Sequence, residues 1–382
     1  MKILLKNVDL YTPDHIGNVD LLIEDGVIIK IDKSLHFKDC QEINCNGKIV
    51  CPMFVDGHEH LFIGNSHGYW STQGIMQSGV GTIVGCLANE QSHTDVDKLI
   101  NIINDINSSN LINAYCMAGS KNYVEDTTNY ILNNKNVVGT KTALFQPQRP
   151  KPNLSYEKLK QDAINTYNAG LKSGKPVQVH IHLDHPFSGR NKETIENINS
   201  GKLDNLNWID KIVEETGVPY SLFKLTHAQK YYDRILEYAN KGCYIDYTAF
   251  SGDYDSRFDC LVKAIKDKTV DLSQISISSD LGIMITEQGH SGEETPSSLL
   301  NTIRKLVLEK GLTLENVLPM ITKNPALLLS LTCGIIKENS TCKLLILDEE
   351  LNINLIINNG ESYLIKDEKI KKICENIKYE KY

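Results

Sequence analysis

The middle of the chain alternates short apolar runs with longer amphipathic segments. The runs have the length and the β-branched content of buried strands, and eight of them occur at 53–60, 81–87, 112–119, 137–145, 176–182, 220–227, 242–250 and 275–280. Helical periodicity fills the gaps, as in VDKLINIINDI, where Val96, Leu99, Ile100, Ile103 and Ile106 fall on one face. Eight strand–helix units in succession predict a parallel (β/α)8 barrel, which carries its active site at the C-terminal ends of the strands. A doubly wound open sheet is the alternative, but no glycine-rich phosphate loop follows the first strand.

Both ends of the chain have a different pattern. The first 50 residues and the last 50 residues consist of short apolar runs separated by polar turns, which indicates strands without intervening helices. Asp25-Gly26 separates two such runs and predicts a tight type I′ hairpin turn. Two β-rich ends therefore flank an α/β middle.

Composition narrows the functional class. The chain has 40 basic and 48 acidic residues, a formal net charge of −8, and 41% hydrophobic residues, which is typical of an ordinary globular protein. This acidity argues against a general nucleic-acid binder, and no apolar run approaches the ~18 residues of a membrane span. The ten cysteines are scattered and never form a CxxC pair, which favours a reducing compartment. We therefore expect a cytoplasmic protein without a membrane or nucleic-acid partner.

Side chains that bind metals recur at the ends of the predicted strands. Strand one ends in His58-Glu59-His60, and positions two apart in a strand share a face, so both imidazoles can reach one ion while Glu59 points away. Any one of these residues is more often a hydrogen-bonded strand cap. Their convergence on one barrel mouth instead predicts a site suited to zinc. The set consists of His58, His60, Lys141, His180, His227 and Asp280.

These segments resemble the amidohydrolase superfamily of metal-dependent hydrolases, and within it the isoaspartyl dipeptidases. The resemblance covers nearly the whole chain and is carried by NVDLLIEDGVIIKID, CPMFVDGHEH, GVGTIVGCL, VVGTKTALF, QVHIH, KLTHAQK and ISISSD. It implies a (β/α)8 TIM-like barrel of residues 53–330. It also implies a small β-sandwich domain composed of residues 1–52 and 331–382.

The resemblance further implies a pair of divalent ions, normally zinc. His58, His60 and Asp280 would hold one ion, His180 and His227 would hold the other, and Lys141 would bridge them as its carbon dioxide-derived carbamate. His182 lies on the same face of its strand as His180 and is the alternative ligand. The implied mechanism is attack of a metal-bridging hydroxide on an amide carbonyl while Asp280 transfers the proton to the leaving nitrogen. Tyr123, in the loop after strand three, is a candidate to stabilise the oxyanion.

The substrate pocket departs from that of an isoaspartyl dipeptidase. Arg149 and Lys230 are the candidates for binding a substrate carboxylate, although Lys230 stands where the dipeptidases have an arginine. The segment 61–81 contains no acidic residue to pair with a substrate ammonium. The leading prediction is a hydrolase of a β-aspartyl dipeptide or a related small substrate.

Other functions remain compatible with the same residues. The alternatives within the superfamily are a cyclic amidase like dihydroorotase, a deaminase like adenine deaminase, and an N-acyl amino acid deacylase. A non-catalytic scaffold is a third class, but such a protein would be expected to have lost some of the six ligands, and all six are present. Relatives commonly assemble through barrel helices, so we expect a homo-oligomer.

Overall fold

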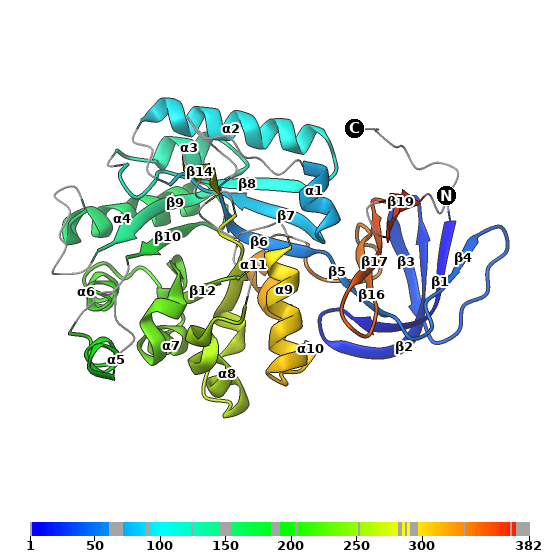
Figure 1. The fold of residues 1–382 in the computed structure, drawn as a ribbon. Coiled ribbons are helices and arrows are strands. Elements are labelled where there is room, and N and C mark those ends of the chain that lie inside the picture. Colours follow the sequence, from blue (N-terminus) through cyan, green and yellow to red (C-terminus); the bar gives the residue numbers. More distant parts are fainter. Residues whose placement is uncertain are drawn as a thin grey trace.

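The computed structural model contains a large α/β barrel beside a smaller β-domain that holds the N-terminus (Figure 1). It describes residues 2–60, 72–88, 92–123, 125–145, 154–184, 192–202, 205–250, 253–281, 285–286, 289–290, 297–327, 329, 331, 333–366 and 369–371. Arg149 and residues 61–71 of the segment 61–81, which the sequence analysis singled out, lie outside these ranges.

Eight parallel strands form the barrel sheet, and they follow one another in chain order. Their bounds are β6 Phe54–Glu59, β7 Val80–Gly85, β8 Asn113–Ala118, β9 Val137–Leu144, β10 Gln178–Leu183, β11 Phe223–Thr226, β12 Tyr244–Thr248 and β13 Ile275–Ser278. Each falls on one of the eight predicted apolar runs, which confirms the barrel architecture. The runs were recognisable because most strand positions are buried, as expected where helices cover a parallel sheet.

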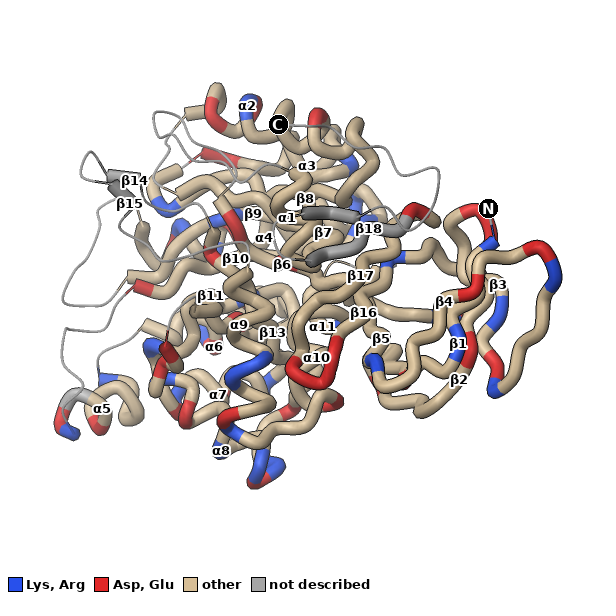
Figure 2. Tube along the Cα trace, turned by 45° about the vertical axis from the view of Figure 1, so that its right-hand side comes forward, with Lys and Arg blue, Asp and Glu red and all other residues tan. Residues whose placement is uncertain are grey.

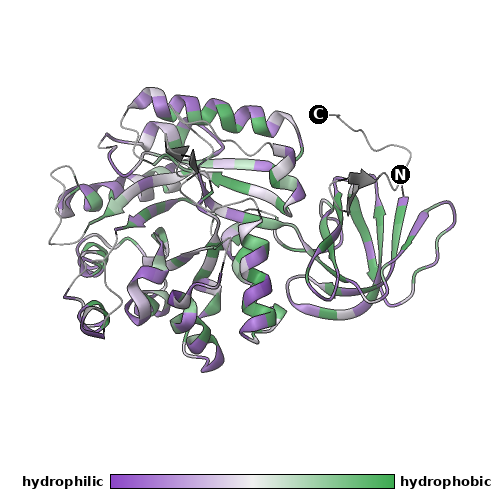
Figure 3. Cartoon of the chain, viewed as in Figure 1, coloured by the Kyte–Doolittle hydropathy of each residue, from purple (hydrophilic) through white to green (hydrophobic). Residues whose placement is uncertain are grey.

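Helices surround this sheet (Figure 1). Their bounds are α1 Thr72–Gln77, α2 His93–Ser108, α3 Thr128–Asn133, α4 Tyr156–Ser173, α5 Lys192–Asn199, α6 Asn207–Thr216, α7 Tyr232–Lys241, α8 Asp259–Lys266, α9 Ser298–Arg304, α10 Leu314–Ile321 and α11 Lys323–Leu327. Helix α2 begins with a capping box between Ser92 and Asp95 and buries Val96, Leu99, Ile100 and Ile103, four of the five residues predicted to share a face. Figure 3 shows hydrophobic residues concentrated on the strands, whereas the surrounding helices carry both hydrophobic and hydrophilic residues.

The two ends of the chain form the β-domain. One nine-stranded mixed sheet contains β1 Lys2–Tyr11, β2 His15–Glu24, β3 Val27–Asp32, β4 Gln41–Asn44, β5 Ile49–Pro52, β16 Lys343–Leu347, β17 Ile353–Asn358, β18 Glu361–Lys366 and β19 Lys369–Lys371. The N-terminal and C-terminal strands meet where β5 pairs with β16 in antiparallel fashion. Asp25 and Gly26 both have positive φ, 47° and 79°, so the predicted hairpin turn is confirmed. Strands β14 Ile285–Thr286 and β15 Gly289–His290 form a separate antiparallel pair.

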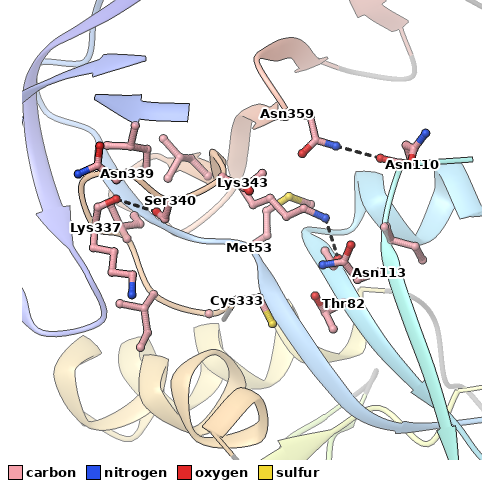
Figure 4. Close-up of a pocket in the computed structure, with 18 of the residues that line it drawn as sticks. Met53, Thr82, Asn110, Asn113, Cys333, Lys337, Asn339, Ser340, Lys343 and Asn359 are labelled. Atoms are coloured by element: carbon pink, nitrogen blue, oxygen red, sulfur yellow. Dashed lines mark hydrogen bonds between the residues drawn. The ribbon is translucent and has the colours of Figure 1, made fainter. Parts of the chain in front are cut away.

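A cavity of about 540 Å³ lies where the β-domain meets the barrel. Figure 4 shows Lys343, Thr82, Asn113 and Cys333 around it. Thr82 and Asn113 belong to the N-terminal halves of β7 and β8, whereas the predicted ligands His60, His227 and Asp280 follow the C-terminal ends of β6, β11 and β13. This cavity is therefore separate from the predicted active site.

The surface carries charges of both signs. Figure 2 shows lysine and arginine interspersed with aspartate and glutamate along helices such as α2, α7 and α8. No helix in the described part of the chain is long and apolar enough to cross a membrane. The nine cysteines within the described ranges are free thiols.

Gly139 changes which face of β9 points into the barrel. Val138 packs with the interior residues Val84 and Met117, and Lys141 reaches His58 inside the barrel, although residues three apart in a regular strand face opposite sides. Between them, Gly139 departs from a regular strand and passes close to β10. A Cβ at Gly139 would lie 2.0 Å from the Gln178 carbonyl oxygen. The glycine therefore permits the irregularity that turns Lys141 inward.

Replacing Gly139 by alanine should lower the free energy of unfolding by about 3 kcal/mol, because the new methyl group overlaps backbone that cannot rotate away. Gly174→Ala is the matched control. Gly174 has a φ of 68°, and a Cβ there meets nothing within 4 Å, so only the left-handed backbone costs energy, about 1 kcal/mol. Urea unfolding measures both variants. Equal losses would show that close strand contact at Gly139 is not the constraint.

Candidate metal centre

Closure of the barrel brings His58, His60 and Asp280 together. The Asp280 amide donates to the His58 carbonyl at 2.9 Å, and the His60 amide donates to the Leu281 carbonyl at 2.7 Å, so the end of β6 is joined to the segment after β13. The Nε2 atoms of His58 and His60 lie 3.1 Å apart. Asp280 Oδ1 lies 3.5 Å from His58 Nε2 and 3.4 Å from His60 Nε2. Residues 220 positions apart in the sequence thus share one site.

Strands β9 and β10 contribute a lysine and a histidine to the same place. Lys141 pairs with His180 in the register of these parallel strands, so the two side chains point to the same face. Lys141 Nζ lies 3.0 Å from His58 Nε2, and the His180 ring centroid lies 4.6 Å from that of His58. The His182 ring instead lies 4.4 Å from the ring of His227. Both histidines of the HIH segment therefore face the cluster.

His227 and Asp280 adopt an uncommon backbone conformation. Their φ angles are 67° and 58°, in the left-handed region that is uncommon for residues other than glycine. His227 Nδ1 lies 2.8 Å from Thr248 Oγ1 and 3.7 Å from Asp280 Oδ2. Such strain concentrates at functional sites, where the surrounding structure holds a side chain in one position.

The cluster contains several histidines and a lysine but few carboxylates to balance their positive charge. Burial lowers the pKa values of His58, His180 and His227 well below the usual range of histidine, and the neighbouring lysines and histidines lower them further. Burial also lowers the pKa of Lys141, to about 8. The imidazoles are therefore neutral, which is the form in which histidine binds a metal.

Several polar atoms of the cluster have no hydrogen-bond partner in the described structure although they are buried. They are His60 Nδ1, both ring nitrogens of His180, His227 Nε2 and Asp280 Oδ1. Buried polar groups are normally satisfied, so this concentration of unpaired atoms indicates a missing partner. Among the residues that the structure describes, two sets have ligand atoms within 4.8 Å of one another: His58 with His227 and Asp280, and His58 with Cys86 and His180. Nitrogen, carboxylate and sulfur ligands in this number fit zinc.

A chain of buried hydrogen bonds orients His58 on its Nδ1 side. Thr226 Oγ1 donates its hydrogen to Asp246 Oδ2 at 2.8 Å. Because that hydroxyl hydrogen is already used, Thr226 Oγ1 accepts a hydrogen bond from His58 Nδ1, 3.0 Å away. That arrangement places the imidazole proton on Nδ1 and leaves the Nε2 lone pair facing the cluster. Lys224 Nζ pairs with Asp246 Oδ1 at 3.3 Å and donates to the Gly57 carbonyl at 2.8 Å.

Of the other predicted site residues, the structure describes Lys230 and Tyr123. Lys230 belongs to a short helical turn after His227, and burial lowers its pKa to about 8 while the Asp280 carboxylate opposes that shift. The Tyr123 hydroxyl lies 2.6 Å from His93 Nδ1, and the ring is buried. Arg149 is outside the described residues. The roles of Lys230, Tyr123 and Arg149 in binding or catalysis stay predictions.

Sequence reasoning missed three contributors to this centre: Cys86, Thr226 and the Lys224–Asp246 pair. Cys86 ends the run GTIVGC, at the same level as other strand-end ligands, and that position was a usable signal. Lys224 and Thr226 alternate within FKLTH on the face that His58 meets. The partner of Lys224 is on another strand, however, and no local pattern identifies it.

Comparison with known sequences gives short matches. A dihydroorotase of Aquifex aeolicus is 40% identical over 63 residues, which is 16% of this chain and 15% of the relative. A dihydroorotase of Acetivibrio thermocellus is 31% identical over 106 residues, 26% of this chain and 24% of the relative. The chain thus matches about a quarter or less of the length of these relatives. No protein-family model matches the sequence.

Solved structures match over nearly the full length. The beta-aspartyl dipeptidase of Fervidobacterium islandicum AW-1 is 26% identical with a TM-score of 0.77, over 98% of this chain and all of that chain. The same dipeptidase in complex with beta-Asp-Leu has a TM-score of 0.78 at 24% identity and the same coverage. The dihydropyrimidinase of Brevibacillus agri shares the fold at 13% identity, with a TM-score of 0.68 over 95% of both chains. Because the dipeptidase likeness extends through the barrel and the β-domain alike, the chain belongs to the amidohydrolase superfamily.

Proposed function

We propose that the protein is a binuclear metal-dependent hydrolase of a C–N amide bond, with β-aspartyl dipeptides as the leading substrate class. The observation that carries this proposal is the concentration of buried, unpaired histidine and aspartate atoms at the C-terminal end of the barrel. The likeness to the Fervidobacterium dipeptidase supports the substrate class.

The proposed ligands divide between two ions, for which zinc fits best. His58, His60 and Asp280 would hold one ion, and His180 and His227 the other. Lys141 would join them as a carbamate, which forms when its neutral amine adds CO₂ and releases a proton. The low pKa of Lys141 is consistent with that chemistry, because burial favours the neutral amine. When bound, such ions polarise a carbonyl and lower the pKa of a coordinated water.

The protein's own groups would position the substrate and move a proton. Asp280 lies between His58, His60 and His227, so its carboxylate can accept a proton at this centre and deliver it to the leaving nitrogen. Lys230 lies three residues after His227, in the helical turn that His227 precedes, and its ammonium would pair with a substrate carboxylate. We assign Arg149 the same kind of role and Tyr123 the stabilisation of developing negative charge on the carbonyl oxygen.

A second candidate is hydrolysis of a cyclic amide, as in dihydroorotase. The local sequence matches to dihydroorotases favour it, and the same ligand set would serve both reactions. The two candidates differ in the substrate: a dipeptide presents an ammonium group as well as a carboxylate, whereas dihydroorotate presents only a carboxylate.

A substrate screen tests this proposal. The zinc-loaded protein is assayed with β-aspartyl dipeptides, N-acyl amino acids, dihydroorotate and aminopurines. We expect turnover of β-Asp-Leu, and a loss of about 10²–10⁴-fold in kcat for Asp280→Asn. Asparagine tolerates the left-handed φ of this position, so the variant removes the charge without changing the backbone. Turnover of dihydroorotate alone would favour the second candidate, and unchanged kcat in the variant would exclude the role of Asp280.

The choice between the two strand-five histidines has its own test. We expect His180→Asn to lose one of the two bound ions, because both ring nitrogens of His180 lack a partner in the described structure. His182→Asn is the matched control and should keep both ions. Metal content after dialysis, measured by atomic emission, distinguishes them. The reverse result would assign the ligand to His182, whose ring contacts His227.

Thr226 should tune metal affinity without touching the metal. Thr226→Val removes the hydroxyl that orients His58, so zinc affinity should fall about 10–100-fold, whereas Thr226→Ser keeps the hydroxyl and should bind nearly as well as the wild type. Competition with a chromogenic chelator measures these affinities. Equal affinity in the valine variant would show that packing alone orients His58.

A further inference from the structure

Cys86 is a buried thiol at the level of the strand-end ligands. It directly follows β7, and its amide donates to the Glu59 carbonyl at 2.8 Å, which ties it to the end of β6 between His58 and His60. Its side chain packs in the interior cluster with Val84 and Met117 and is 0% exposed. Cys86 therefore faces the inside of the barrel, where the histidines are.

The sulfur is close enough to each of two histidines to share an ion with either of them. Cys86 Sγ and one ring nitrogen each of His58 and His180 lie within 4.8 Å of one another. Zn–S and Zn–N bonds of about 2.3 and 2.0 Å place tetrahedral ligands roughly 3–4 Å apart, so a small contraction would bring the sulfur onto the ion of either histidine. His180, with neither ring nitrogen bonded in the described structure, is the independent sign that this set awaits a ligand.

We propose that Cys86, as its thiolate, is a metal ligand of this centre, between His58 of one proposed ion and His180 of the other. The inference rests on the proposed metal centre and adds a sulfur ligand to it. As the ion binds, the S–H bond breaks, the sulfur keeps the electron pair and donates it to the ion, and the proton leaves to solvent. No oxidant or reductant takes part.

A thiolate changes both the charge and the metal preference of the centre. Cys86 and Lys141 both adjoin His58, so thiolate, carbamate and the Asp280 carboxylate would place three negative charges against two divalent ions. Thiolates favour zinc and cobalt over magnesium and manganese, which prefer oxygen. The centre would therefore retain zinc in the presence of excess magnesium.

Cobalt spectroscopy tests the inference directly. The wild-type protein, stripped of metal and loaded with Co²⁺, should show a near-ultraviolet thiolate-to-cobalt charge-transfer band in addition to the visible cobalt bands. Cys86→Ser should lose the charge-transfer band, keep the visible bands, and bind zinc about 10–100-fold more weakly. Cys116→Ser is the matched control: Cys116 is equally buried on the adjacent strand β8 but packs in the outer core between sheet and helices, so its variant should keep the band.

The outcomes separate this inference from the proposed function. Bound cobalt without a charge-transfer band in the wild type would overturn the thiolate ligand and leave the hydrolase proposal standing, whether or not the variants fold. A band that persists in Cys86→Ser would also overturn it. A protein that binds no cobalt at all would overturn both proposals.

Discussion

Closure of the barrel between β6 and β13 is the constraint on which the centre depends. Two backbone hydrogen bonds, from the Asp280 amide to His58 and from the His60 amide to Leu281, join the first and last strand ends of the barrel. Asp56, in β6, strengthens the junction because its carboxylate accepts a hydrogen bond from the backbone amide of Ser279. Without this closure, His58 and Asp280 would sit on opposite edges of an open sheet.

Burial then determines the chemistry of the side chains that closure brings together. Desolvation keeps His58, His180 and His227 neutral and lowers the pKa of Lys141, so the groups are electron-pair donors rather than cations. Asp280 is the carboxylate among them. A set of donors that lack partners in the described structure is costly to bury, and a divalent ion is the simplest partner that satisfies them.

The residues that position His58 also form a buried polar network. Asp246 accepts hydrogen bonds from Thr226, Ser276 and Ser278 and pairs with Lys224, so every strand from β11 to β13 contributes to one buried network. Gly57 leaves room for the Lys224 ammonium, because a Cβ there would lie 2.6 Å from Nζ. A buried ion pair of this kind adds little net stability but holds its members in one geometry. The ring of His58 is oriented by that geometry.

The local features of this protein follow from its amino-acid sequence. Neighbouring residues are enough to indicate the buried strands, the apolar helix face of 96–106, the Asp25-Gly26 turn and the metal-binding residue types at strand ends. The eight barrel strands and the superfamily could therefore be predicted. Which side chains meet depends instead on how the strands pair and close. The inward turn of Lys141 depends on the contact of Gly139 with β10, the pairing of Lys224 with Asp246 joins two strands, and the approach of Cys86 to His58 and His180 joins three. Strand register and barrel closure are non-local, so no short pattern encodes these contacts.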